Sequence, residues 1–247
     1  MSEMTTCART ECNRRNIAKL VGAYVGGVLS IVFALVIAHL PLLVPLAALV
    51  VLGCSGWYLY RYVDRFVLAS LGGAAADPDR HARLHNLTDG LCIAAGVERP
   101  ELYVVADDSA NLCSVARDTR HSAIVVTSGL LDALDRIELE GVLAHELAHI
   151  KNLDARLATL LCLAPIARGM LGAHRESLAD LAAVELTRYP PGLIGGLEKM
   201  RERGTHVARA PKWTWHLWME PVSSASAQAR ARTELSIDDR IAALREL

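Results

Sequence analysis

The sequence predicts a mostly helical α+β protein in which an N-terminal transmembrane helical hairpin precedes a domain with a small β-sheet. Two long uncharged runs near the N-terminus predict the hairpin. Two short segments rich in β-branched residues predict the sheet, and segments with helical periodicity surround them.

Composition excludes two broad classes of protein. The 247 residues are 52% hydrophobic and the mean hydropathy is +0.26, whereas a disordered chain has low hydrophobicity and high net charge. The formal net charge is −1, so the whole chain lacks the basic footprint of a nucleic-acid-binding protein. We therefore expect a folded protein with no nucleic-acid partner.

The predicted hairpin consists of residues 20–38 and 40–60, which carry no charge. A bilayer core of about 30 Å is crossed by about 20 apolar residues in a helix, so each run is long enough to span it. A tight turn at His39, Leu40 and Pro41 separates the runs. A cleaved signal peptide has a shorter apolar region with no second span directly behind it. The alternative is a helical hairpin buried in the core of a soluble protein.

Basic residues flank the two runs, whereas the turn between them has no Lys or Arg. These residues are Arg14, Arg15 and Lys19 before the first run, and Arg61 and Arg65 after the second. Because positively charged flanks stay on the cytoplasmic side, we expect a multi-pass cell-membrane protein with both termini in the cytoplasm. The expected parts are a cytoplasmic segment (1–19), the hairpin (20–60) and a cytoplasmic domain (61–247).

The sequence of the first part of the domain predicts one helix and two strands. Residues 79–95 have leucines on one helical face and are followed by Gly96, which is typical of a helix end. Residues 101–106 and 123–127 are rich in β-branched residues and predict strands that could be neighbours in a small sheet.

The second part predicts three helices: residues 136–152, 174–188 and 237–247. The first has an apolar stripe close to the 3.6-residue period, formed by Ile137, Val142, Leu143, Leu147 and Ile150. The second is broken by residues 190–192, which are Pro-Pro-Gly. An uncharged run at 157–167 is too short to span a bilayer, so we expect a core or interfacial segment.

The predicted helix 136–152 contains an H-E-x-x-H motif, His145-Glu146-Leu147-Ala148-His149. Histidines at i and i+4 lie on one face of a helix, one turn apart, where neutral imidazoles suit a zinc ion. Glu146 is next to the first histidine and can act as a general base toward a water molecule.

A third ligand is predicted downstream. Glu176 begins the helix 174–188, and Asp180 lies four residues further on the same face. A carboxylate added to two histidines leaves one position open, which is typical of a catalytic zinc site. Asp180 could orient a ligating histidine by accepting its other ring N–H. The alternative is a solvated helix face beside Arg175.

His216 is a candidate cleft residue because it lies within a cluster of tryptophans, Trp213, Trp215 and Trp218. The alternative for this cluster is a core or an anchor at the membrane interface, where Trp is enriched.

These features resemble the HtpX-type membrane zinc metallopeptidases, which are related to the CAAX prenyl proteases. The resemblance covers about residues 80–205 and rests on four segments: RLHNLTDGLCIAAGVERPELYVV, IVVTSGLLDAL, ELEGVLAHELAHIKNLD and RESLADLAAVEL. It implies a gluzincin-like metallopeptidase domain with one zinc ion. The implied zinc ligands are His145, His149 and Glu176, and the implied catalytic base is Glu146.

The resemblance also implies supporting residues. Asp180 would stand behind a ligand, Asn111 matches an asparagine placed over the cleft, and Arg240 matches an arginine that supports the active site. The family often has a His-Pro pair six residues before that arginine, but Glu234 and Leu235 occupy these positions here.

Two further departures concern the substrate cleft and the membrane part. Leu112-Cys113-Ser114 stands where an Ala-Phe-Ala type of segment is usual. Fuller members of the family have one or two more spans between the motif helix and the third ligand, an interval that here holds only residues 157–167.

We therefore expect a membrane-anchored zinc endopeptidase that hydrolyses peptide bonds of membrane or misfolded proteins, with its active site in the cytoplasm. Glu146 would be the general base, and Arg240 or His216 could stabilise the oxyanion. The expected partners are a protein or peptide substrate and the lipid bilayer. One alternative is a non-catalytic membrane adaptor or regulator that retains the fold. Another is a prenyl-protein protease, although two spans leave little room for an intramembrane chamber.

Overall fold

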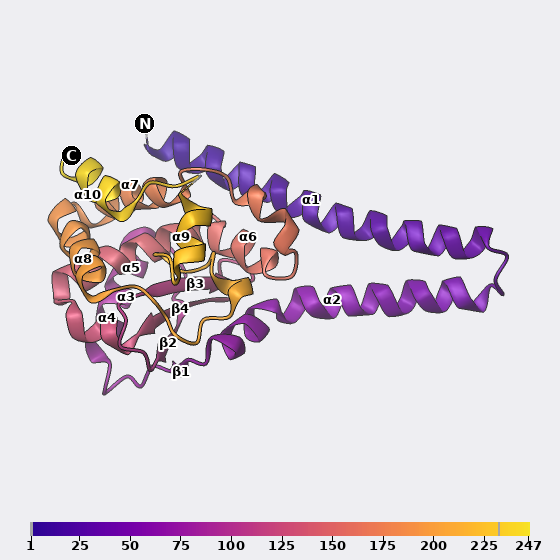
Figure 1. The fold of residues 1–247 in the computed structure, drawn as a ribbon, viewed down its shortest axis with the longest axis horizontal. Coiled ribbons are helices and arrows are strands. Elements are labelled where there is room, and N and C mark those ends of the chain that lie inside the picture. Colours follow the sequence, from indigo (N-terminus) through magenta and orange to yellow (C-terminus); the bar gives the residue numbers. More distant parts are fainter. Residues whose placement is uncertain (1, 232) are drawn as a thin grey trace.

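A computed structural model describes residues 2–231 and 233–247. Two long helices, α1 (Ser2–Ile37) and α2 (Leu43–Leu71), run side by side and project from a folded domain (Figure 1). The turn between them contains His39 with a φ of 54°, so the predicted hairpin and its turn are confirmed. Many apolar side chains of the hairpin are exposed, such as Phe33 at 66% and Leu43 at 78%. The alternative of a hairpin buried in a soluble core is therefore wrong.

The two helices touch through a tyrosine and a glycine. Tyr24 on α1 donates a hydrogen bond to the carbonyl of Leu52 on α2 at 2.6 Å. A Cβ atom at Gly56 would lie 2.4 Å from the Tyr24 ring. Glycine is therefore the residue that lets the Tyr24 ring lie against α2.

Both helices continue beyond the uncharged runs and pack against the domain. In α2 the residues Val63, Val67 and Leu71 are buried at a spacing of four. In α1, Asn13 and Ile17 are buried before the uncharged run begins. The charged residues that end an apolar run do not end a helix, because helical hydrogen bonds need no apolar side chain. The hairpin and the domain are thus joined by two uninterrupted helices.

The sheet has four strands in the order β1-β2-β4-β3. They are β1 (Ala74–Ala75), β2 (Glu101–Val105), β3 (Leu112–Ala116) and β4 (Ser122–Thr127). The predicted strands at 101–106 and 123–127 correspond to β2 and β4, which pair in parallel, whereas β1 and β3 pair antiparallel at the two edges. The sequence analysis missed β1 and β3, because β1 has two residues and β3 (LCSVA) has few β-branched residues.

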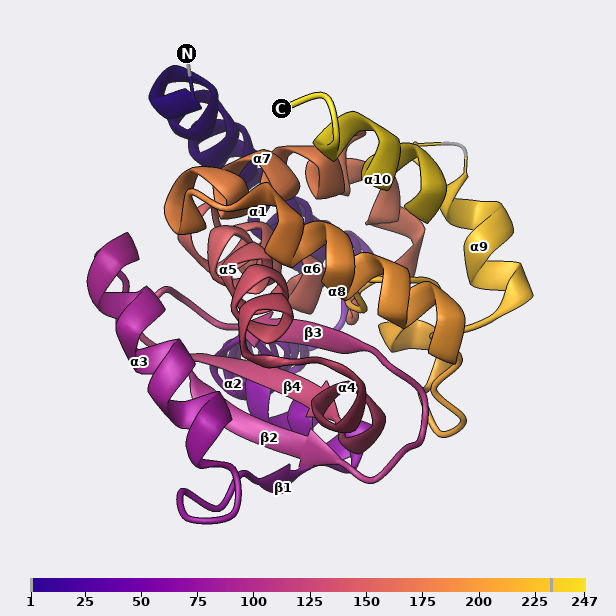
Figure 2. The same ribbon diagram turned by 90° about the vertical axis from the view of Figure 1, so that its left-hand side faces the viewer.

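The helices of the domain pack around the sheet (Figure 2). They are α3 (Ala82–Ala95), α4 (Ser128–Ala133), α5 (Arg136–Lys151), α6 (Asp154–Leu161), α7 (Arg175–Thr187), α8 (Pro190–Arg203), α9 (Ser224–Arg230) and α10 (Ile237–Leu244), with 3-10 turns at Pro165–Leu171 and Lys212–Thr214. The predicted helices at 79–95, 136–152, 174–188 and 237–247 are confirmed within a few residues. The Pro-Pro-Gly break is confirmed as well, and it also starts α8, where Pro is tolerated in the first turn.

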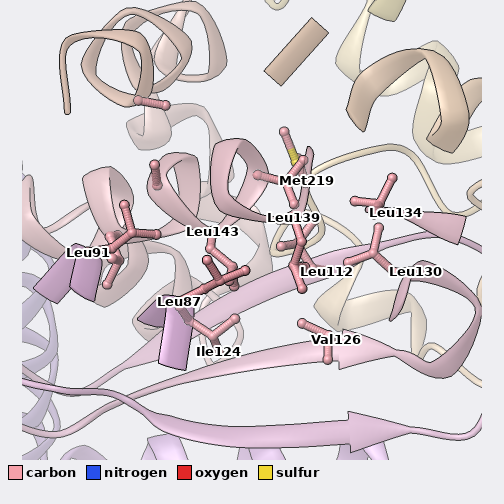
Figure 3. Packing of buried hydrophobic residues seen from close by; sticks show 14 of the residues in the cluster. Leu87, Leu91, Leu112, Ile124, Val126, Leu130, Leu134, Leu139, Leu143 and Met219 are labelled. Carbon is pink, nitrogen blue, oxygen red and sulfur yellow. The ribbon is translucent and has the colours of Figure 1, made fainter. Parts of the chain in front are cut away.

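Helix α5 lies at the centre of the core. Leu139 and Leu143 of α5 face Ile124 of the sheet and Leu87 of α3 (Figure 3). The predicted apolar stripe of α5 is correct except at Ile137, which is 51% exposed. Residues 141–150 are buried on all sides because α3, α7, α8 and β3 surround them.

The uncharged run 157–167 divides into two parts. Its first half belongs to α6, where Leu157 and Leu161 are completely buried. Its second half leaves the core, and Ile166 is fully exposed while Leu163 is 41% exposed. The prediction of a core segment is confirmed for the first half, and that of an interfacial segment stays a prediction for the second half.

The close contact between α5 and α8 gives a stability prediction. A Cβ at Gly141 would lie 2.6 Å from the backbone nitrogen of Leu193. We expect Gly141→Ala to destabilise the protein by about 1–3 kcal/mol, since backbone must move to admit the methyl group. The midpoint of thermal unfolding in detergent measures the effect. Gly90→Ala, in α3 with open space around it, is the control and should not lower the midpoint; equal losses would contradict the packing argument.

Candidate metal centre

The H-E-x-x-H motif lies on the last two turns of α5. The helix begins with a capping box, in which Asp135 accepts hydrogen bonds from the amides of Ile137 and Glu138 at 2.8 and 3.0 Å. The carboxylate of Glu138 accepts the Asp135 amide at 2.7 Å in return. This cap and the surrounding core fix the start and the axis of the helix.

The two histidines of the motif meet a carboxylate from α7. Nε2 of His145 lies 3.1 Å from Nε2 of His149 and 3.1 Å from Oε2 of Glu176. The third separation, from Nε2 of His149 to Oε2 of Glu176, is 3.6 Å. All three side chains are buried, with exposures of 0%, 4% and 1%. The structure thus brings together the three residues predicted as metal ligands.

These separations fit a zinc ion. Ligand atoms at about 2.0–2.1 Å from a tetrahedral zinc lie about 3.3 Å apart, and the separations of the three atoms are 3.1, 3.1 and 3.6 Å. Two imidazole nitrogens and one carboxylate oxygen are also a donor set that zinc accepts in catalytic sites.

Glu146 is buried with no partner for its charge. Its side chain is 1% exposed, and neither carboxylate oxygen has a hydrogen-bond partner among the described residues. A buried carboxylate without a partner is costly, so such a group points to a ligand that completes the site.

Asp180 lies behind His145, on the side away from the cluster. Its Oδ1 lies 2.9 Å from Nδ1 of His145, so the ring N–H donates to the aspartate and the Nε2 lone pair faces the cluster. Arg240 donates to both oxygens of Asp180, at 2.7 and 2.6 Å, and also to Glu220. Burial raises the pKa of Asp180, but Arg240 outweighs it and holds that pKa at about 2. Arg240 therefore keeps Asp180 ionised.

The second oxygen of Glu176 faces two arginines. Arg175 donates from Nε to Oε1 at 2.7 Å, and Arg230 lies 3.5 Å from the same atom. Burial alone would raise the pKa of Glu176, but the two guanidinium groups hold it well below its usual range. The alternative of a solvated face for Glu176 and Asp180 is wrong, because Asp180 and Arg175 are 3% and 5% exposed.

Asn111 uses its side-chain amide to join two segments. It lies just before the edge strand β3, and its Nδ2 donates to the carbonyls of Thr205 and Glu220, both at 2.9 Å. Its Oδ1 accepts the amides of Leu112 and Glu220 at 3.0 and 3.2 Å. Asn111 thus fixes the backbone of Glu220, whose carboxylate pairs with Arg240.

His216 lies against α6. Its Nε2 is 2.9 Å from the carbonyl of Ala158 and 3.9 Å from Sγ of Cys162. Burial lowers the pKa of His216 to about 3, so its ring is neutral and its Nε2–H donates to Ala158. Its backbone carbonyl accepts a hydrogen bond from Arg175 at 2.8 Å. This bond connects the tryptophan cluster with α7, the helix that carries Glu176.

Glu234, which occupies the position of the expected histidine, serves as a cap for α7. Its carboxylate accepts the backbone amides of Arg175 and Glu176, at 3.1 and 3.3 Å. A carboxylate is favourable at a helix N-terminus, where backbone N–H groups are unpaired. Glu234 therefore helps to position α7, the helix that carries the third predicted ligand.

The sequence analysis missed several charged residues around the site: Arg9, Asp154, Glu220 and Arg230. They come from distant parts of the chain, and Arg230 follows a stretch of small polar residues that gave no signal. Of these residues, Asp154 could have been found from the sequence, because it is a carboxylate only five residues after His149.

A helix that presents two histidines and a glutamate to a carboxylate on a second helix, beside a small mixed sheet, defines the metallopeptidase class of fold. Comparison with known proteins places the chain within this class. Residues 78–189 match peptidase family M48, and the chain belongs to that family.

The most similar relatives include protease HtpX homologues from three bacteria. The homologue from Dictyoglomus turgidum is 33% identical over 236 residues, covering 77% of this chain and 78% of that protein. The one from Dictyoglomus thermophilum is 33% identical over 233 residues, with coverages of 76% and 77%. The one from Caldanaerobacter subterraneus is 28% identical over 241 residues, with coverages of 77% and 80%. The expected resemblance to HtpX-type peptidases is confirmed.

The Asp180–Arg240–Glu220 group gives a second stability prediction. Arg240→Met removes the charge that neutralises two buried carboxylates, so we expect a loss of about 3–5 kcal/mol. Unfolding followed by circular dichroism in detergent measures it. The control is Arg245→Met at the end of the same helix, where the side chain is 62% exposed and a surface pair contributes about 0–1 kcal/mol. Similar losses in the two variants would contradict the role assigned to Arg240.

Proposed function

We propose that this membrane protein is a zinc-dependent endopeptidase. The observation that carries the proposal is the pairing of a buried His145–His149–Glu176 cluster with the unpartnered carboxylate of Glu146 next to it. Membership of peptidase family M48 supports the reaction class. A protein with only a structural metal would have no use for a buried, unpartnered glutamate, which argues against a non-catalytic adaptor.

In this proposal His145, His149 and Glu176 hold one zinc ion. A zinc ion bound there would lower the pKa of a water molecule and polarise the carbonyl of the scissile peptide bond. Asp180 keeps the proton of His145 on Nδ1, so that Nε2 remains free to bind. Arg175 and Arg230 keep Glu176 ionised, because both lie on its second oxygen.

Glu146 carries the proton transfers of the reaction. Its carboxylate accepts a proton from the attacking water and later delivers a proton to the amine that leaves. No described side chain competes for either of its oxygens, so both remain available to water and substrate. The substrates we propose are membrane proteins or misfolded proteins, since the site stands on a membrane hairpin.

For the membrane placement we propose that residues 20–38 and 40–60 span the bilayer. Residues 1–19 and the domain 61–247 then lie in the cytoplasm with the active site, as the flanking basic residues favour. The exposed residues Leu163 and Ile166 follow α6, which packs against both α1 and α2. In this placement they reach the headgroup level beside the hairpin.

The role of Glu146 gives the central activity prediction. We expect Glu146→Gln to reduce the cleavage of an unfolded test protein about 10²–10⁴-fold, because the amide cannot accept a proton. The zinc content should stay at one ion per chain, since Glu146 is not a ligand. Quantified fragments on gels and metal analysis of the same samples provide the two measurements.

The control for this variant is Glu140→Gln, on the same helix but away from the cluster. It should cleave at the wild-type rate. Equal rates for wild type and Glu146→Gln would overturn the proposal, and a zinc-bound wild-type protein with no cleavage would favour the adaptor.

Metal removal gives a further prediction. Treatment with a chelator should abolish cleavage, and addition of about one equivalent of zinc should restore it, since the three buried donor atoms favour a single ion. Activity that persists after all metal has been removed would contradict a zinc-dependent mechanism.

A further inference from the structure

Each histidine of the cluster has an aspartate behind it. Asp180 lies 2.9 Å from Nδ1 of His145, and Oδ2 of Asp154 is 3.5 Å from Nδ1 of His149. Asp154 is 1% exposed and occupies the first turn of α6. Histidines that bind a metal almost always direct the other ring nitrogen to an acceptor, often a carboxylate, which fixes the ring. Nδ1 of His149 is buried and makes no hydrogen bond to a described residue, so Oδ2 of Asp154, at ion-pair distance, is the acceptor placed beside it.

The two aspartates are themselves held by arginines from opposite ends of the chain. Asp180 is held by Arg240 near the C-terminus. Asp154 is held by Arg9 near the N-terminus, which donates from Nε to Oδ1 at 2.9 Å, with its Nη2 at 2.8 Å from the same atom. The two chain ends lie near each other on one side of the domain (Figure 1).

A second residue of α1 also binds Asp154. Nδ2 of Asn13 donates to Oδ1 of Asp154 at 2.8 Å and to the carbonyl of Asn152 at 2.9 Å. Arg9 and Asn13 are four residues apart, so they lie on one face of the helix. Because both donors converge on Oδ1, the other oxygen of Asp154 is left to face His149.

These contacts belong to the helix that enters the membrane. The uncharged run begins at residue 20, seven residues after Asn13, which is about 10 Å along a helix. Asn16 donates to the carbonyl of Met170 at 2.9 Å, and Ile17 is buried against the domain. The segment 9–17 of α1 is therefore packed on the domain immediately before the first span.

We propose that Arg9 and Asn13 are positioning residues for His149, which act through Asp154, so that zinc affinity depends on the segment of α1 before the membrane. The inference rests on the proposed zinc site. It assigns a function to an N-terminal segment that otherwise serves as the entry to the hairpin. It also means that displacing α1 from the domain weakens the metal site.

The test is the zinc dissociation constant of the full-length protein in detergent, measured by competition with a chromophoric chelator. We expect Asp154→Asn and Arg9→Ala to weaken zinc binding about tenfold or more, because residues behind a ligand typically contribute 10–100-fold in affinity. Arg9→Lys should retain part of the affinity, since it keeps one charged donor. The matched control is Arg15→Ala, on the same helix with an exposed side chain, which should bind zinc like wild type.

A purely structural role of Arg9 predicts a different result. In that case Arg9→Ala would lower the unfolding midpoint of the metal-free protein but leave zinc affinity and the visible spectrum of the cobalt-substituted protein unchanged. If Arg9→Ala does not fold, Asn13→Ala provides the same comparison. If wild type binds zinc and the variants bind it equally well, this inference alone is overturned. If wild type binds no zinc, the proposed function is overturned as well.

Discussion

Two imidazoles one helical turn apart can bind one ion only if both turn a lone pair toward the same point. A histidine ring does not do this by itself, because its proton can occupy either nitrogen. Here Asp180 accepts from Nδ1 of His145, and Asp154 faces Nδ1 of His149, while the two Nε2 atoms lie 3.1 Å apart. Much of the domain serves this constraint. Helix α5 is buried on all sides, and the aspartates stand on two further helices whose positions are fixed by the core and by the two ends of the chain.

Holding the rings in this way requires buried charge and two strained backbone positions. Burying an ion is costly unless a countercharge and hydrogen bonds surround it, and the structure gives Glu176, Asp180 and Asp154 arginine partners. The backbone is also strained at two positions, beside Asp154 and beside Arg175. Leu153 and His174 have φ values of 62° and 61° and directly precede Asp154 and Arg175. Left-handed conformations of such residues cost about 1–3 kcal/mol each, and here they stand at the starts of the two helices that carry Asp154 and Glu176.

Local patterns predicted the hairpin, the central helices and the motif residues His145, Glu146 and His149, because each depends on spacing within a short segment. Glu176 lies 27 positions after His149, and its selection depended on its place at the start of a second predicted helix and on the family resemblance. The sequence analysis failed where the deciding contact is long-range. Arg9 and Asp154 are 145 positions apart, and no periodicity connects them. The position of Ile137 was also wrong, because the packing of α8 and not the helical period decides which side of α5 is exposed. The sequence shows Glu234 at the position where the family often has a histidine. That Glu234 caps α7 could not be predicted, because it depends on the fold bringing this distant residue to the start of α7.

In the proposed metal site, two histidines of α5 and one carboxylate of α7 together bind zinc. X-ray absorption at the zinc edge of the purified full-length protein tests this directly. We expect nitrogen and oxygen neighbours at about 2.0–2.1 Å from the zinc. The scattering should correspond to two imidazole ligands in wild type and to one in His149→Ala. Sulfur neighbours at about 2.3 Å, or an unchanged imidazole signal in His149→Ala, would contradict it.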